Sequence, residues 1–289
     1  MNEVISDMFS RYHCSDLESV ENATKEIVQE VTLLGLSRST FFSSAAFYGG
    51  TALRIFHRLP RFSEDMDFTL EQSDRNFDLA KYLPYALNEL EAYGLALEAN
   101  KKEKTKINSI RTAFLKGNER ELILEMTQDR ELAMRVPANK VMKIKVEIDV
   151  DPPAGANTQT LYSLVPSPYR AKLYDMPSMF ASKIHALLLR EYSNRVKGRD
   201  FYDYMWYLSQ GTTVNLGHLQ HRMERSGKWD PKETLTLESL KAILAERFET
   251  VDYDSARADV FRFLKDEEKK SLDIWSSEFF MDITEQYLK

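Results

Sequence analysis

The chain has 289 residues, of which 43% are hydrophobic and 29% charged, and its formal net charge is −6. This length suits one large domain or two modest ones, and the composition is ordinary for a globular protein. No apolar run approaches the ~18 residues that a membrane-spanning helix needs, and the N-terminus lacks the pattern of a signal peptide. The single cysteine, Cys14, excludes an intramolecular disulfide and a Cys-rich zinc site. We therefore expect a cytoplasmic protein without a membrane segment.

The net charge argues against a general nucleic-acid binder, whose affinity would depend on bulk positive charge. Two local basic clusters are compatible with it, and either could equally be a solvated loop. One cluster comprises Arg190, Arg195, Lys197 and Arg199, and the other comprises Lys101, Lys102, Lys104 and Lys106.

The first 100 residues alternate between helical and strand-like patterns. Apolar residues at helical spacing predict a helix over residues 17–36. A short apolar run at 43–48 leads into Gly49-Gly50, and a second helix is predicted from Thr51 to Leu59, before Pro60. Residues 65–70 are predicted to form a strand, and residues 76–92 an amphipathic helix that stops at Gly94.

Strands are then predicted at 95–99, 107–115, 121–127 and 141–150. The last is the clearest, because apolar residues alternate strictly with lysines and acids. A cluster of prolines and glycine between 152 and 168 indicates a domain boundary, and helical patterns dominate from about residue 175. The fold class is α+β: a mixed-sheet domain over 1–165 and a helical domain over 166–289.

The most informative stretch combines Gly49-Gly50-Thr51 with Asp65 and Asp67. Glycines permit close backbone approach, and a helix N-terminus binds phosphate through its N–H groups, while Thr51 can cap the helix or contact phosphate. Aspartates two apart on a strand share a face, with Cα atoms roughly 6.5–7 Å apart, and can flank a divalent ion. An Asp-x-Asp pair alone is commonly an acidic strand edge, and the preceding glycine turn is what favours a site for Mg²⁺ or Mn²⁺ and a nucleoside triphosphate (NTP).

Further polar residues complete this candidate site. The polar face of the 141–150 strand offers Glu147 or Asp149 as the third carboxylate, and spacing does not separate the two. Arg61 and Ser63, just before the Asp strand, could contact phosphate or simply lie in a loop.

Lys183 lies on or beside the apolar stripe of the first helix after residue 175, where an ammonium group must reach solvent or an anion. Asp200 and Asp203 are three apart on the next helix and share a face.

Four segments of the chain resemble the AbiEii-type nucleotidyltransferase toxins, within the DNA polymerase β-like nucleotidyltransferase superfamily. Together they cover about residues 48–205, in the order expected for that family: 49–54 with 61–68, 145–153, 179–188 and 197–204. The resemblance implies that Lys183 contacts the NTP phosphates and that Asp200 or Asp203 completes the catalytic set, in a cleft between the two domains.

The resulting hypothesis is a magnesium-dependent nucleotidyltransferase. Asp65 and Asp67 bind metal with Glu147 or Asp149, and an acceptor hydroxyl attacks the α-phosphorus of the NTP. The resemblance further implies the toxin of a type IV toxin–antitoxin or abortive-infection system, an RNA acceptor, tRNA in some members, and a cognate antitoxin. Two alternatives are a non-catalytic NTP-binding regulator and a kinase-like transferase that modifies protein.

Overall fold

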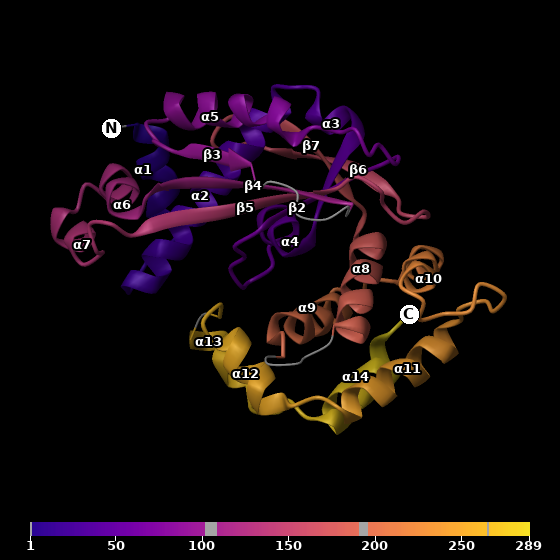
Figure 1. Ribbon diagram of the computed structural model, residues 1–289. Coiled ribbons are helices and arrows are strands. Elements are labelled where there is room, and N and C mark those ends of the chain that lie inside the picture. The colour runs from indigo at the N-terminus through magenta and orange to yellow at the C-terminus, as the bar shows by residue number, and fades with distance from the viewer. Residues whose placement is uncertain (1, 102–108, 191–195, 265) are drawn as a thin grey trace. The chain divides into compact units, whose positions relative to one another are not determined.

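The structure is a computed structural model that describes residues 2–101, 109–190, 196–264 and 266–289. The chain divides into two compact units that are discontinuous in sequence (Figure 1). Unit 1 comprises residues 1–58, 62–152 and 159–173, and unit 2 comprises residues 59–61, 153–158 and 174–289.

Unit 1 combines helices with a seven-stranded mixed sheet. Its helices are α1 (Glu3–Ser10), α2 (Leu17–Ser37), α3 (Phe41–Ser44), α4 (Gly49–His57), the 3-10 turn η1 (Leu79–Lys81), α5 (Leu83–Ala92), α6 (Glu119–Thr127) and α7 (Arg130–Met134). Its strands are β1 (Ala45–Tyr48), β2 (Met66–Leu70), β3 (Glu98–Lys101), β4 (Ile110–Asn118), β5 (Val141–Asp149), β6 (Thr158–Ser163) and β7 (Tyr169–Tyr174).

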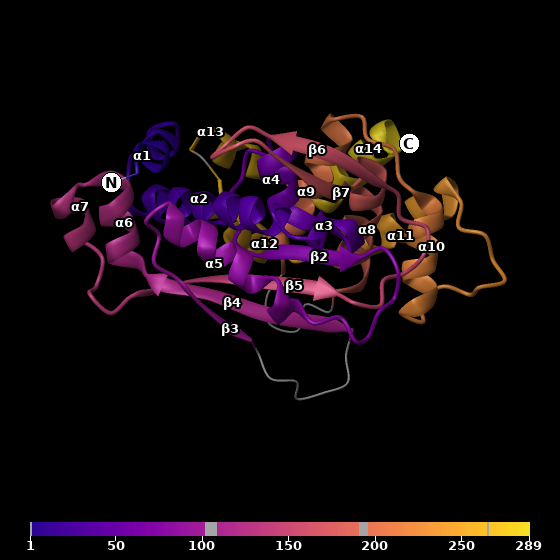
Figure 2. The same ribbon diagram turned by 90° about the horizontal axis from the view of Figure 1, so that it is seen from above.

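The strand order is β3-β4-β5-β2-β1-β7-β6. Strand β2 lies at the centre, antiparallel to β1 and parallel to β5, and Figure 2 shows β3, β4, β5 and β2 side by side. The apolar face of β5 is buried, as its alternating sequence predicts. This face comprises Met142, Ile144, Val146 and Ile148. Helices α2 and α5 pack on each other and on strands of the sheet (Figure 1), which closes the core around these side chains.

The predicted mixed sheet followed by helices is confirmed, and the long elements are close to their expected limits. Helix α2 begins with a capping box in which Asp16 and Ser19 bond reciprocally to each other's backbone N–H. The helix expected over 76–92 is a 3-10 turn followed by α5, which has Pro84 in its first turn.

The prediction of a strand at 121–127 is wrong, because these residues belong to helix α6. The side chain of Asn118 accepts a hydrogen bond from the Glu121 N–H and caps the helix. Leu122, Ile123 and Met126 are buried at helical spacing, a pattern that a short apolar run shares with a strand. Strands β6 and β7 also occupy the proline-containing segment, where no strand was expected.

Unit 2 is helical, as the sequence predicted for this part of the chain. Its elements are α8 (Met176–Leu189), α9 (Gly198–Ser209), α10 (Leu216–Arg225), α11 (Leu237–Glu249), α12 (Tyr253–Phe261), α13 (Asp266–Lys269), the 3-10 turn η2 (Lys270–Leu272) and α14 (Ser277–Tyr287). Helix α8 begins at the N-cap Asp175, whose side chain accepts from the Ser178 N–H. Close packing of α9 on α12 requires Gly198, where a Cβ would lie 1.8 Å from the carbonyl oxygen of Ala256. Among the helices of the described residues, none has the length and hydropathy needed to cross a membrane.

Candidate functional site

The carboxylates of unit 1 are arranged by the pairing of β2 with β5. Asp67 is in register with Glu147 on the neighbouring parallel strand, and Thr69 is in register with Asp149. Neighbouring strands lie about 4.8 Å apart. Side chains in register on adjacent strands project from the same face of the sheet. Asp65 immediately precedes β2. Glu147 is therefore the carboxylate beside Asp67, whereas Asp149 lies two residues farther along the sheet.

The glycine turn lies directly against one of these carboxylates. Gly49, the first residue of α4, has φ +82°, a backbone conformation that favours glycine. A Cβ at this position would lie 2.7 Å from Oδ2 of Asp67. Both the backbone conformation and the contact with the aspartate thus require glycine here.

The N-terminus of α4 presents backbone N–H groups beside this turn. The N-cap residue, Tyr48, is extended and makes no side-chain capping bond in the described structure. The first N–H groups of a helix have no partner within the helix, and the helix dipole favours negative charge there. Gly49, Gly50 and Thr51 therefore begin a helix whose first turn suits a phosphate group.

The Thr51 hydroxyl is engaged within the protein. Thr51 is fully buried, and its Oγ1 lies within hydrogen-bond distance of the Asp65 carbonyl oxygen and 2.9 Å from the Ser63 Oγ. Because a carbonyl can only accept, Thr51 donates to Asp65 and accepts from Ser63. The two hydroxyl groups thus join the glycine turn to the segment that precedes β2.

Glu147 is held by two side chains of unit 1. Its Oε1 accepts from the Thr112 hydroxyl at 2.9 Å, and its Oε2 lies 2.5 Å from Lys145 Nζ. Burial alone would lower the pKa of Lys145, but its hydrogen bond to Glu147 and the carboxylates of Glu147, Asp65 and Asp67 raise it above its ordinary value. Lys145 therefore stays charged and balances part of the negative charge of this site.

Asp65 and Asp67 have the chemistry that hard divalent cations prefer, since carboxylate oxygens are their usual ligands. Within the described residues, however, no group of three or more His, Cys, Asp or Glu side chains is gathered closely enough to hold a metal. The contacts of Glu147 with Lys145 and Thr112 give one reason. The carboxylates of the two aspartates suit Mg²⁺ or Mn²⁺ by their chemistry, and Glu147 would join them by exchanging its present partners.

Asp149 has a different local role. Its Oδ1 accepts from the Asp151 N–H at 3.1 Å and so stabilises the turn that follows β5.

In unit 2, Lys183 lies between two carboxylates. Its Nζ is 2.8 Å from Oδ1 of Asp200 and 2.8 Å from Oδ2 of Asp203, and its side chain is 14% exposed. Asp200 also binds Arg190 at 2.6 Å. The buried side of α8 thus carries a lysine whose charge is satisfied by anions rather than by solvent.

The most deeply buried ion pair of unit 2 joins Arg61 to Asp203. Nε and Nη2 of Arg61 lie 2.6 Å from the two carboxylate oxygens of Asp203, and the side chains are 3% and 0% exposed. Burial alone would raise the pKa of Asp203, but Arg61 and Lys183 hold it below its usual value. Burial would likewise lower the pKa of Arg61, and Asp203 raises it. Both groups are therefore charged at neutral pH.

The cluster of ion pairs in unit 2 carries three positive charges and two negative ones. Its members are Arg61, Lys183, Arg190, Asp200 and Asp203. Lys183 and the half-exposed Arg190 bring the excess positive charge toward the surface of unit 2. A cluster of this kind attracts a phosphate while its buried members stay paired.

A family model for the nucleotidyl transferase AbiEii toxins of type IV toxin–antitoxin systems matches residues 32–282. The chain belongs to this family. The match covers the glycine turn and the carboxylates of unit 1 as well as Lys183, Asp200 and Asp203 in unit 2, and it confirms the resemblance seen in the sequence motifs. An AbiEii-family protein is a nucleotidyltransferase toxin, and the type IV system implies an NTP substrate and an antitoxin partner.

No curated protein matches this AbiEii-family chain. Two solved structures from Helicobacter pylori are similar to it at 16% identity: one is described as a candidate nucleotidyltransferase, and the other is JHP933. The match to the first structure covers 90% of this chain and 89% of the Helicobacter pylori chain, with a TM-score of 0.45. The match to JHP933 covers 91% of this chain and 88% of the JHP933 chain, with a TM-score of 0.44. Likenesses at this level add nothing to what the family match shows.

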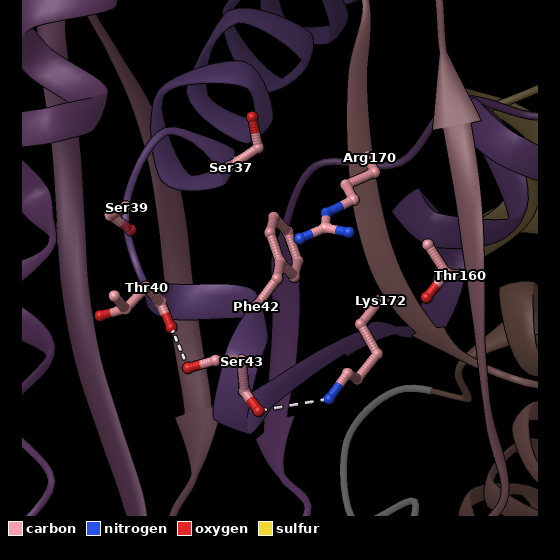
Figure 3. A pocket seen from close by; sticks show the side chains of 8 residues that line it. All are labelled: Ser37, Ser39, Thr40, Phe42, Ser43, Thr160, Arg170 and Lys172. Carbon is pink, nitrogen blue, oxygen red and sulfur yellow. Dashed lines mark hydrogen bonds between the residues drawn. The ribbon is translucent and has the colours of Figure 1, made fainter.

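A separate pocket of about 420 Å³ lies in unit 1 at the opposite end of β1 from Gly49, and none of the predicted site residues lines it (Figure 3). Its lining includes Lys172, which pairs with Glu71 at 2.6 Å, and Ser37 and Ser39, whose hydroxyls donate to carbonyls of α2. Much of its polar surface is satisfied by the protein, so the chemistry of this AbiEii-family member is better sought at the carboxylates.

The described members of the two basic clusters make contacts within the protein. Arg190 binds Asp200, and Lys101 lies 2.7 Å from Asp78. The guanidinium of Arg199 lies 4.3 Å from the ring centre of Phe263. Four members lie outside the described residues: Lys102, Lys104, Lys106 and Arg195.

The structure brings two further residues, which the sequence did not single out, into contact with the candidate site or the segment before it. Lys145 pairs with Glu147, and Gln29 on α2 bonds the backbone at Ser63 and Glu64. The polar face of β5 was a signal for Lys145. A buried glutamine inside a helix gives no comparable local signal.

Proposed function

We propose that this AbiEii-family protein uses Mg²⁺ or Mn²⁺ to transfer a nucleoside monophosphate (NMP) from an NTP to an RNA, with tRNA as the acceptor class. The proposal is supported by the close approach of Gly49 to Asp67, because the N-terminus of a helix, which can bind phosphate, then adjoins a carboxylate, which can bind metal. Phosphate and metal ligands adjoin in this way because a metal–triphosphate complex is bound as one ligand.

In the proposed site, the N–H groups of Gly49, Gly50 and Thr51 bind phosphate oxygens. Asp65 and Asp67 hold the divalent cation, and Glu147 is the third ligand because it is in register with Asp67. When bound, the cation neutralises the charge that develops on the phosphate oxygens.

The transfer forms a bond between an RNA hydroxyl oxygen and the α-phosphorus and breaks the bond from that phosphorus to pyrophosphate. One of the unit 1 carboxylates accepts the proton of the attacking hydroxyl. Lys183 contacts the NTP phosphates, supported by the net positive charge of its cluster.

Asp200 and Asp203 complete the proposed set by holding the Lys183 ammonium group in place through two ion pairs. Arg61 and Ser63 remain predicted phosphate ligands, although each would have to exchange its present partner, Asp203 or Thr51. The cognate antitoxin is the proposed partner protein.

The test is to incubate the purified protein with each α-labelled NTP, Mg²⁺ and either total RNA or cell protein. We expect label in RNA, and none in reactions with Asp65→Ala. Label in protein instead would favour a protein-modifying transferase, and NTP binding without any label would favour a regulator. Full transfer by Asp65→Ala would show that the metal site is misassigned.

A further inference from the structure

The segment that carries Asp65 into β2 is fixed through three consecutive backbone carbonyl groups. The amide nitrogen of Gln29 lies 3.1 Å from the Ser63 carbonyl oxygen and 2.9 Å from that of Glu64. The Thr51 hydroxyl donates to the next carbonyl, that of Asp65. Two helices, α2 and α4, therefore supply the donors through side chains that are both fully buried.

Gln29 makes these bonds although one of its own atoms is left unsatisfied. Its Oε1 is buried and has no hydrogen-bond partner among the described residues. A buried polar atom without a partner lowers stability, so an apolar residue would be the expected occupant of this fully buried position. The two bonds that its amide nitrogen donates to the Ser63 and Glu64 carbonyls are the favourable contribution that offsets this cost.

A third contact reaches the same segment from α2. Lys25, one helical turn before Gln29, lies 3.1 Å from the Glu64 carboxylate. That pair is partly exposed and contributes little energy, whereas the Gln29 bonds are shielded from water. Gln29 is therefore the main link between α2 and the residues before Asp65.

We infer that Gln29 is a positioning residue for the metal site, acting through the Ser63 and Glu64 backbone on Asp65. The inference rests on the proposed function, because it assigns Asp65 to the metal. The Gln29 side chain fixes where the Asp65 Cα lies and in which direction its carboxylate leaves the backbone. A shift of about 1 Å in a catalytic group can reduce a rate by about 100-fold.

The test substitutes Gln29→Met, which keeps the approximate length of the side chain and removes both donors. In metal-free protein, we expect amide hydrogen exchange of the peptide spanning 62–67 to become at least tenfold faster. We also expect Mn²⁺, measured by electron paramagnetic resonance in the presence of a non-hydrolysable NTP analogue, to bind about tenfold more weakly. Neither measurement requires the acceptor to be known.

The matched control is Thr32→Val on the same helix. Thr32 is also buried, but its hydroxyl bonds the Val28 carbonyl within α2 and does not touch the segment. The Thr32→Val variant should lower stability without changing amide hydrogen exchange at 62–67 or the affinity for Mn²⁺. If Gln29→Met behaved like this control, the positioning role would be wrong.

A second pair of variants keeps the test decisive if Gln29→Met does not fold. Thr51→Val removes the donor to the Asp65 carbonyl, and Thr51→Ser retains it. Weaker Mn²⁺ binding in the valine variant with recovery in the serine variant supports the backbone anchor, and equal binding in both contradicts it. Wild-type protein that bound no Mn²⁺ under these conditions would overturn the proposed function, and the inference with it.

Discussion

Both units contain closely spaced aspartates, but the surroundings of these aspartates differ. In unit 1, Asp65 and Asp67 are partly exposed at the start of the central strand β2, and Glu147 stands beside Asp67 on the next strand. In unit 2, Asp200 and Asp203 are 2% and 0% exposed, and each binds two basic side chains.

The difference separates two uses of the same chemistry. Like charges on adjacent strands repel each other, Lys145 balances only part of this charge, and the remainder favours the arrival of a cation from solution. Buried carboxylates that already bind arginine and lysine instead hold those cations in fixed positions. Substitutions in unit 1 should therefore change catalysis, and substitutions in unit 2 should first change stability.

The largest effect is expected for Asp67→Asn. The proposed loss of metal-assisted charge stabilisation amounts to several kcal/mol, so transfer of NMP should fall by about 1,000-fold. The free energy of unfolding should change by less than about 0.5 kcal/mol, because Asp67 is partly exposed and Asn has nearly the same shape. Label transfer and urea denaturation measure the two quantities. Asp7→Asn, at an exposed position of α1, is the control, and similar transfer by both variants would refute the assignment.

Arg61→Met should cause the largest loss of stability. It leaves the Asp203 carboxylate buried without its guanidinium partner, which typically costs about 3–5 kcal/mol. Tryptophan fluorescence during urea denaturation is a selective probe, because Trp206, Trp229 and Trp275 all lie in unit 2.

Two further variants make this second prediction specific. Arg61→Met combined with Asp203→Leu should recover most of the lost stability, since the carboxylate that lost its guanidinium partner is then removed as well. Glu285→Gln removes an ion pair whose carboxylate is 79% exposed and should cost at most about 1 kcal/mol. A small effect of Arg61→Met alone would show that the buried pair does not organise unit 2.

Acid pH should destabilise unit 2 by about 3 kcal/mol through His218. Burial lowers the pKa of this fully buried histidine to about 4, below the ordinary value near 6.5. Between these values the unfolded chain binds a proton that the folded chain does not, so stability present above pH 6.5 is lost as the pH falls to 4. Urea denaturation at several pH values, followed by tryptophan fluorescence, measures the slope.

His218→Gln should reduce that slope, while His221→Gln, at an exposed position of the same helix, should not. Burial also lowers the pKa of His185 to about 4, so part of the slope should remain. Asp203 acts in a different range: its pKa is lowered, so its contribution persists down to its unfolded pKa near 3.9 and is lost only in stronger acid. An unchanged slope in His218→Gln would contradict this account.

The smallest expected effect is a gain. Lys145→Met removes the cation that pairs with Glu147, and Mn²⁺ should then bind about tenfold more tightly, equivalent to ~1.4 kcal/mol. Lys143→Met, on the same face of β5, removes a lysine that lies 3.9 Å from the ring centre of Phe114 and should have little effect. Titration followed by electron paramagnetic resonance distinguishes them, and weaker binding in Lys145→Met would make the lysine a component of the site.

Local patterns predicted the elements that carry the site. Period-two alternation defined β5, helical spacing defined α2, and the residues after 175 indicated α8. The prediction at 121–127 was wrong because apolar residues at 122, 123 and 126 fit either a strand or a helix. The N-cap hydrogen bond of Asn118 stabilises the helix.

The partners of the site residues could not be predicted in the same way. Arg61 and Asp203 are 142 residues apart, and no local rule joins them. Gln29 is a polar residue within a helix, and its role depends on which carbonyl groups the fold brings to it. Sequence motifs identified the chemistry, whereas the neighbours that tune it follow from tertiary packing.

The long separation of Arg61 from Asp203 also has a consequence in time. At a synthesis rate of about 5–20 residues per second, Asp203 leaves the ribosome roughly 7–28 s after Arg61. During that interval the guanidinium must remain hydrated, and α9, with its two aspartates, does not yet exist. If Lys183 has the proposed role, the nascent chain lacks part of its catalytic set until α8 and α9 have been made.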